Sequence, residues 1–224
     1  MPTALATFCL FSLLVIGRLA AQTNAILRPG LTLGERPQDI ASGTWLGLVK
    51  SVGTYSLQPV QVATLDTTDA CAGNAILITS TPHAAEFLLR IPSLKPGAVR
   101  TATTTPTFIY PGQNTSWQVA PDQWFGVFAY GKAEPIQGNT LFSDYLLTIG
   151  HGRDLDTLSF PTRFPADGLP TILWAGDLDR DGRPDLIADL TTHYEGHRWA
   201  LFLSRGRRTP TRIEPVAERV EPGC

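Results

Sequence analysis

Four aspartates alternate through one short stretch near the end of the chain, the sequence DLDRDGRPD of residues 177–185. They occupy positions 1, 3, 5 and 9 of the stretch and are Asp177, Asp179, Asp181 and Asp185. A hard cation such as Ca²⁺ takes roughly six to eight oxygen ligands, and a tight loop can turn alternate side chains toward one centre. Gly182 permits the sharp bend of such a loop, and the carbonyl of Arg183 can supply a backbone ligand. The spacing predicts a Ca²⁺ site, because four carboxylates this close together would repel one another without a cation.

The residues that follow this loop distinguish between types of calcium site. An EF-hand carries a glutamate at position 12 and continues as a helix, whereas this chain has Ala188 there and residues 185–190 predict a strand. Residues 171–205 resemble the FG-GAP or VCBS-type repeats of integrin α-chain propellers and of many exported bacterial proteins. In these repeats a DxDxDGxxD loop joins two strands and binds Ca²⁺. The resemblance implies that the four aspartates are side-chain ligands and that Arg183 is a backbone ligand.

Two alternatives to a functional calcium site stay open at this point. The stretch could be an acidic surface turn without a metal, or the ion could hold a hairpin and do nothing else. The chain contains a single copy of the repeat, and no internal repeat of propeller type is present, so no propeller is implied.

A second candidate site follows the predicted strand. His193, Glu195 and His197 are spaced two apart, so an extended segment would point all three to one side, as a zinc site or an acid/base group requires. Surface loops also contain such residues by chance. A carboxylate pair drawn from Asp154, Asp156 and Asp167 could serve a glycosidase, but spacing does not show which of them approach one another. The chain has no GxSxG nucleophile elbow.

An aromatic-rich region lies in the middle of the chain. Its members are Trp117, Trp124, Phe125, Phe128 and Tyr130. On an exposed sheet face such rings stack on sugars, and in a sandwich they fill the core. Residues 123–130 are apolar on both faces, which predicts a buried central strand and places these rings in the core.

The segments that must position these residues are short and separated by turns. Apolar runs rich in β-branched and aromatic residues predict strands at 44–50, 55–65, 75–80, 86–91, 99–105, 115–119, 123–130, 141–149, 172–174, 185–190 and 199–204. No long helical period interrupts them, so the strands should pair antiparallel. We expect an all-β fold, either an antiparallel β-sandwich or two packed small β units, with one calcium-loop hairpin near the C-terminus. Residues 22–43 are expected to form an extended lead-in to a domain over residues 44–224, with a possible sub-boundary near 101–106.

Composition excludes several classes of protein. The chain has 224 residues, of which 43% are hydrophobic and 17% charged, and its formal net charge is −2. Such a chain can bury a large core, which argues against intrinsic disorder, and no dense basic cluster suits a nucleic acid. The high content of glycine and proline, 20 and 18 residues, suits many turns and argues against a helical bundle.

The first 21 residues are expected to be a signal peptide. An uncharged apolar run over residues 4–16 precedes small residues at Ala20 and Ala21. As a helix this run would span about 20 Å, short of the roughly 30 Å of a bilayer core, so no stable membrane insertion is expected after cleavage. The alternative is an uncleaved anchor. The mature chain would keep Cys71 and Cys224, which we expect to pair as one disulfide, with two unpaired thiols as the alternative.

These features together predict a secreted or periplasmic, non-enzymatic Ca²⁺-binding β protein. The ion would order a hairpin for binding or adhesion to a glycan or a surface protein. The alternative is an exported hydrolase that uses the His193, Glu195 and His197 loop or a carboxylate pair. A third possibility is a subunit of an export or adhesion complex.

Overall fold

The computed structural model describes residues 24–33, 40, 44–70, 73–103, 107–121, 123–136, 138–151, 154–160, 163–192, 196–204 and 215–223. The predicted signal peptide, Cys71, Cys224, His193 and Glu195 lie outside these residues. In the described part the chain is built from antiparallel strands with one short 3-10 turn, η1 (Ala166–Gly168), which confirms the predicted all-β fold. None of the described residues forms a helix with the length and apolarity needed to cross a membrane.

The larger sheet has 12 strands. In chain order they are β1 (Ala25–Leu27), β2 (Gly30–Leu33), β3 (Trp45–Ser51), β4 (Thr54–Asp69), β5 (Gly73–Thr81), β6 (Phe87–Arg90), β7 (Gly97–Thr103), β8 (Thr107–Phe108), β14 (Thr171–Asp177), β15 (Asp185–Asp189), β16 (Gly196–Phe202) and β17 (Ala217–Pro222). Its main path runs β1-β6-β3-β4-β7-β14-β15-β16-β17. The sheet curls until its two ends meet, where Asn24 Nδ2 donates a hydrogen bond to the carbonyl of Val216 at 2.9 Å.

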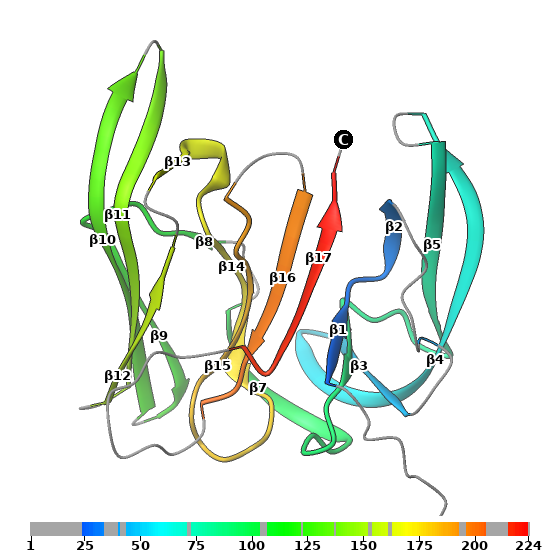
Figure 1. Cartoon of the computed structure of the whole chain (residues 1–224). Helices are drawn as coiled ribbons and strands as arrows, with labels where there is room; N and C mark the ends of the chain where they lie inside the picture. Colours follow the sequence, from blue (N-terminus) through cyan, green and yellow to red (C-terminus); the bar gives the residue numbers. More distant parts are fainter. Residues whose placement is uncertain are drawn as a thin grey trace, which may run out of the picture.

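The smaller sheet has five strands and lies on the left in Figure 1. They are β9 (Asn114–Ala120), β10 (Gln123–Ile136), β11 (Asn139–His151), β12 (Asp154–Ser159) and β13 (Arg163–Pro165). Its inner face packs against strands β14, β15 and β16, which form the middle layer of the molecule. Strands β1, β3, β4 and β6 lie on the other side of that layer (Figure 1).

The middle layer is buried on both faces. Ile172, Leu186 and Phe202 belong to the core shared with the five-stranded sheet. Trp174, Ile187 and their neighbours belong to the core shared with β3, β4 and β6. Apolar residues at consecutive positions are what a strand buried on both faces requires. This doubly buried layer carries the acidic loop, which joins β14 to β15.

Two expectations differ from the structure. Part of the expected lead-in joins the larger sheet, because β1 pairs with β6 and β2 with β5, and Ile26 and Leu27 are buried in the core. The placement of the whole aromatic region in the core is wrong for one face of β10. Phe125 is buried beside Trp117, but Trp124, Phe128 and Tyr130 are exposed, because the outer face of the five-stranded sheet carries no covering layer within the described residues.

Candidate metal site

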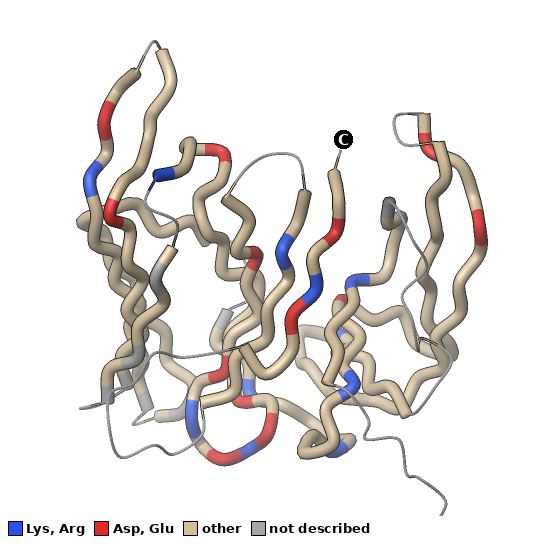
Figure 2. Tube along the Cα trace, in the orientation of Figure 1, with Lys and Arg blue, Asp and Glu red and all other residues tan. Residues whose placement is uncertain are grey.

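The acidic loop joins two strands of the middle layer. Strand β14 ends at Asp177 and β15 begins at Asp185, so both carboxylates are anchored on rigid, buried backbone. Figure 2 shows the loop between them as the densest group of charged residues in the lower part of the view. Leu178 follows Asp177 and is itself fully buried in the core, which holds the loop against the sheet. The strands therefore fix the first and last aspartates before any ion is considered.

The backbone of the loop bends as the sequence predicts. Gly182 has a φ of +82°, in the left-handed region that favours glycine, and Arg180 adopts a φ of +63°. Asp179 and Asp181 each accept a hydrogen bond from the backbone N–H two residues ahead, on Asp181 and Arg183, at 3.2 and 2.8 Å. These local bonds wind the loop tightly.

Asp185 organises the site from its centre. One of its carboxylate oxygens accepts the backbone N–H of Leu178 at 2.6 Å and that of Asp179 at 3.3 Å, and the other accepts the N–H of Ser204 at 3.0 Å. The residue has no exposed surface. Burial, followed by the nearby charge of Asp179, raises the pKa of the Asp185 carboxyl well above its usual value, although the three N–H donors oppose this shift.

Three carboxylates gather around one point. Asp177, Asp179 and Asp185 each offer one oxygen, and these oxygens lie within 4.8 Å of one another. Burial also raises the pKa of Asp177, and burial and the charge of Asp181 raise that of Asp179. In a buried setting such groups must be protonated or balanced by a positive charge.

Asp177 carries the most specific feature of the cluster. One of its oxygens accepts the N–H of Gly182 at 3.2 Å. The other, Oδ1, is buried and has no hydrogen-bond partner among the described residues, while Asp177 as a whole is only 3% exposed. A buried, unpartnered carboxylate oxygen is costly. The residues thus fit a cation, and the cluster of Asp177, Asp179 and Asp185 could hold a metal ion.

The other two predicted ligands take part in the loop differently. Asp181 is exposed and is not a member of the cluster of three. Its carboxylate faces the backbone N–H of Arg183, whose own backbone was predicted to supply a ligand. Both residues remain predicted ligands.

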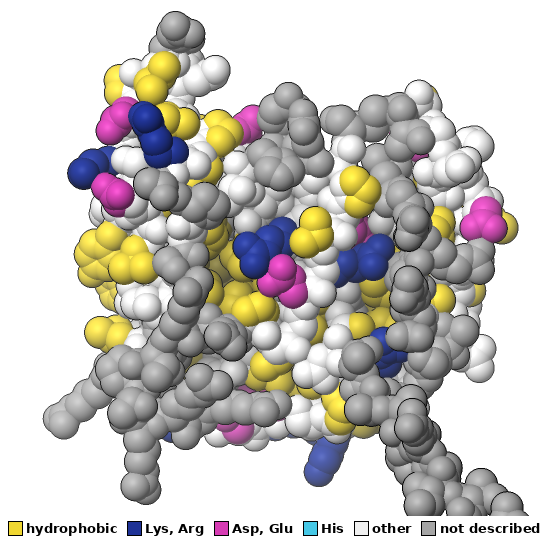
Figure 3. All heavy atoms as spheres, in the orientation of Figure 1, with side chains coloured by type: hydrophobic (Ala, Val, Ile, Leu, Met, Phe, Trp, Pro, Cys, Tyr) yellow, Lys and Arg dark blue, Asp and Glu magenta, His cyan; other side chains and the backbone are white. Residues whose placement is uncertain are grey.

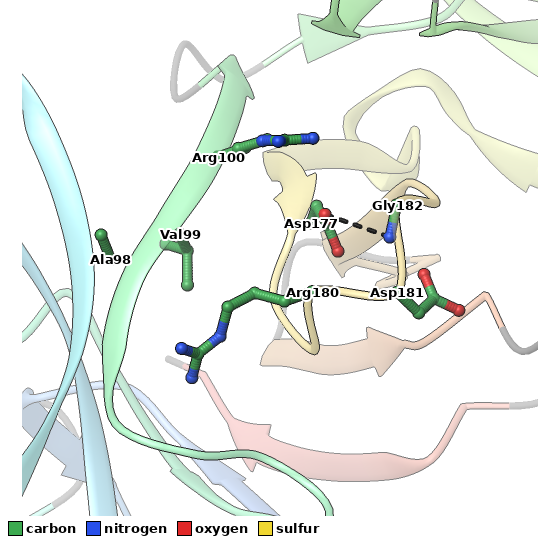
Figure 4. A pocket seen from close by; sticks show the side chains of 7 residues that line it. All are labelled: Ala98, Val99, Arg100, Asp177, Arg180, Asp181 and Gly182. Atoms are coloured by element: carbon green, nitrogen blue, oxygen red, sulfur yellow. Dashed lines mark hydrogen bonds between the residues drawn. The ribbon is translucent and has the colours of Figure 1, made fainter.

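Two arginines, Arg180 in the loop and Arg100 on β7, lie at the site and were not predicted from the sequence (Figure 4). A cleft lies between the loop and β7, and its lining includes Arg100, Asp177 and Arg180. The Arg180 guanidinium leaves this cleft and donates to the carbonyls of Lys95 and Pro96, the latter at 2.9 Å. These contacts join residues more than 80 positions apart, so no local pattern could have indicated them.

The second candidate site is described only at His197. This residue lies in β16, its Nδ1 is 2.7 Å from a carboxylate oxygen of Asp189, and its ring stacks on Trp199 at 4.6 Å. The other oxygen of Asp189 accepts the backbone N–H groups of Thr191 and Arg198 at 3.1 Å each. Of the three candidates for a carboxylate pair, Asp167 is exposed on η1, and the side chains of Asp154 and Asp156 lie outside the described part of the structure.

Comparisons with protein-family models, with curated proteins and with solved structures find no match to this chain. The site must therefore be interpreted from its own geometry.

Proposed function

We propose that this protein binds one Ca²⁺ ion in the loop of residues 177–185, and that the ion has a structural role. It would neutralise the three gathered carboxylates and fix the β14–β15 hairpin. The observation that carries this proposal is the buried Oδ1 of Asp177, which has no partner in the described part of the chain and lies beside two other carboxylates.

The chemistry of the site favours Ca²⁺ over other ions. Every side chain in the cluster is a carboxylate, and hard oxygen ligands suit Ca²⁺ better than zinc or copper. Asp181 and the carbonyl of Arg183 would complete the ligand set, as the resemblance to FG-GAP and VCBS-type loops implies. Mg²⁺ demands near-ideal octahedral geometry and retains its waters, so a carboxylate-rich protein loop favours the larger ion.

The cellular setting is part of the same proposal. We propose that residues 1–21 direct export and that the protein acts outside the cytoplasm as a non-enzymatic binding protein for a glycan or a surface protein. Extracellular Ca²⁺ near a millimolar suits loops of modest affinity. Sequencing the N-terminus of the protein recovered from its native source tests export, because a start at Met1 would contradict cleavage near Ala21.

Thermal melts of the chain from Gln22 onward test the ion. An ion at a hundredfold excess over its Kd adds about 2.7 kcal/mol. For a chain of this length that raises the midpoint by roughly 5–10 °C. We expect this rise with millimolar Ca²⁺ relative to EDTA, a smaller one with Mg²⁺, and none with Ca²⁺ in the variant Asp179→Ala. Asp167→Asn, which removes an exposed carboxylate elsewhere, is the matched control and should respond like the wild type. Equal midpoints in EDTA and Ca²⁺ for the wild-type chain would overturn the proposal.

One observation favours a second candidate, the exported hydrolase. The hydrogen bond between Asp189 and His197 holds the imidazole in one orientation. In many hydrolases a carboxylate holds the general-base histidine in the same way. Screening chromogenic esters and glycosides tests this candidate. Turnover that disappears in His197→Ala but survives in Asp179→Ala would favour the hydrolase over the structural calcium protein.

A further inference from the structure

The outer face of the five-stranded sheet carries a row of exposed apolar side chains. Trp124, Phe128 and Tyr130 point outward from β10 and are 55%, 38% and 58% exposed, and Leu155 of β12 is 47% exposed. Figure 3 shows hydrophobic side chains gathering along the left margin of the molecule, over this sheet. We call these four residues the aromatic face. A contiguous exposed apolar patch of this kind often marks a binding site.

Two glycines flatten the aromatic face. Gly126 and Gly150 are directly paired across β10 and β11, and Leu155 pairs with Gly150 on the next strand. A methyl group added at Gly126 would lie 2.9 Å from the Phe128 ring, and one added at Gly150 would lie 3.1 Å from Leu155. The Phe128 ring therefore packs flat against the backbone at Gly126, where no side chain intervenes. The result is a low platform with Trp124 and Tyr130 on either side of Phe128 along one strand.

The side chains that the structure describes next to the platform are polar and uncharged. In the register of the sheet, Ser116 and Gln118 of β9 and Thr157 of β12 share this face. The nearest charged pair along β10 lies beyond Gly131, where Lys132 and Asp144 bind each other at 2.9 Å. Figure 2 likewise places the charges of β10 and β11 toward the upper end of the sheet. A nucleic acid would need unpaired basic groups beside the stacking rings, and among the described residues this face offers none.

The size of the platform argues for a small ligand. An aromatic side chain has about 150–250 Å² to bury, so three rings about half exposed and one leucine offer about 400 Å². A stable interface with a protein or with a second copy of this chain needs about 800 Å² from each partner.

We infer that the aromatic face binds a neutral oligosaccharide. The apolar C–H faces of pyranose rings would stack on Trp124 and Tyr130, with Phe128 between them, while hydroxyl groups at the sugar rims would reach Ser116, Gln118 and Thr157. Along a strand Trp124 and Tyr130 are about 20 Å apart, so the ligand must contain several sugar units. This inference gives the proposed binding role a partner class but does not depend on the ion.

Affinity electrophoresis in native gels tests the inference. The gels contain soluble mixed-linkage β-glucan, galactomannan or pullulan, with pectate as the acidic control. We expect at least one neutral polysaccharide, and not pectate, to retard the wild-type protein. Trp124→Ala and Tyr130→Ala should each raise the apparent Kd obtained from the retardation about tenfold, because a loss of about 1.4 kcal/mol of stacking corresponds to a tenfold change in Kd. Phe108→Ala removes an equally exposed ring from β8, away from this sheet, and should change nothing.

The outcomes separate this inference from the calcium proposal. Retardation should persist in EDTA, below the melting temperature of the ion-free chain, and in Asp179→Ala. The inference is overturned if no neutral polysaccharide retards the protein, or if Trp124→Ala is retarded as strongly as the wild type. It is also overturned if gel filtration shows a dimer that Trp124→Ala dissociates, because a second copy would then cover the face. If the wild-type midpoint is the same in EDTA and in Ca²⁺ but a neutral polysaccharide still retards the protein, only the proposed ion site is contradicted.

Discussion

Replacing Asp177 with asparagine should change the stability of the protein in opposite directions with and without Ca²⁺. The substitution keeps the size of the side chain and one oxygen for the N–H of Gly182. It removes the negative charge of a buried carboxylate that has one oxygen without a partner. In EDTA that charge is expected to cost stability, whereas with Ca²⁺ it would be a ligand of the proposed ion.

The magnitude follows from the spacing of the carboxylates. The oxygens of Asp177, Asp179 and Asp185 lie within 4.8 Å of one another. At an effective dielectric constant of about 20, two full charges at that separation repel by about 3.5 kcal/mol. Burial raises the pKa of these carboxyl groups, so they are not all fully charged, and the gain from removing one charge is smaller. We expect Asp177→Asn to gain about 1–2 kcal/mol in EDTA and to lose the stabilisation of about 2.7 kcal/mol that the proposed Ca²⁺ ion would give the wild type at a hundredfold excess over its Kd.

Thermal and urea unfolding monitored by circular dichroism provide the assay, with wild type, Asp177→Asn and the control Asp167→Asn in EDTA and in Ca²⁺. In EDTA the midpoint of Asp177→Asn should exceed that of the wild type by roughly 2–8 °C, and in Ca²⁺ the order should reverse. A midpoint lowered equally in both solutions would refute the reasoning, because it would mean that the carboxylate stabilises the fold without an ion.

Three further predictions concern the contacts around the loop. Arg180→Ala should lower the free energy of unfolding by about 1 kcal/mol, because the hydrogen bonds to residues 95 and 96 are lost. Arg180→Gly should lower it less, because glycine adopts the left-handed backbone of this position without strain. Urea unfolding of both variants measures the difference. Gly176→Ala should destabilise by about 1–3 kcal/mol in the same assay, because its Cβ would lie 2.2 Å from the carbonyl oxygen of Arg100, and an equal stability would show that β7 can move aside. Burial raises the pKa of Asp189, but hydrogen bonds from the Thr191 hydroxyl, His197 and two backbone N–H groups outweigh it and lower that pKa overall. The stability that Asp189 contributes is therefore present above the unfolded pKa of about 3.9 and lost as the pH falls through the lower folded value. The difference in unfolding free energy between wild type and Asp189→Asn, measured from pH about 7 to about 2.5, should shrink only in the acidic range, and a constant difference would contradict this account.

The sequence alone indicated the local elements well. Each apolar run predicted as a strand overlaps a strand of the structure, and the loop of residues 177–185 joins two of them with Gly182 in the left-handed region. These features depend on neighbouring residues, because turn chemistry and the alternation of side chains act over a few positions. Six strands were not predicted, since they are short or gain their stability from distant partners: β1, β2, β8, β12, β13 and β17.

The outer face of β10 shows where local patterns cease to be informative. Two apolar faces fit a buried central strand, yet Trp124 and Tyr130 are exposed because no described element covers that side of the sheet. Hydrophobicity indicates that a face can be buried, and only the packing of layers decides whether it is. The core assignment was therefore right for Phe125 and wrong for Trp124.

For the acidic loop, too, the sequence determines some properties and the tertiary structure determines others. The types and spacing of the aspartates determined which chemistry the loop could perform, because carboxylates at alternate positions suit a hard cation wherever the loop lies. Tertiary structure decided the rest: it buried Asp177 and Asp185 between two cores, left Asp181 in solvent and brought Ser204 onto Asp185 and Arg180 onto residues 95 and 96. These partners are distant in sequence. Burial raises the cost of an uncompensated charge, and burial is a property of the whole fold that no stretch of nine residues encodes.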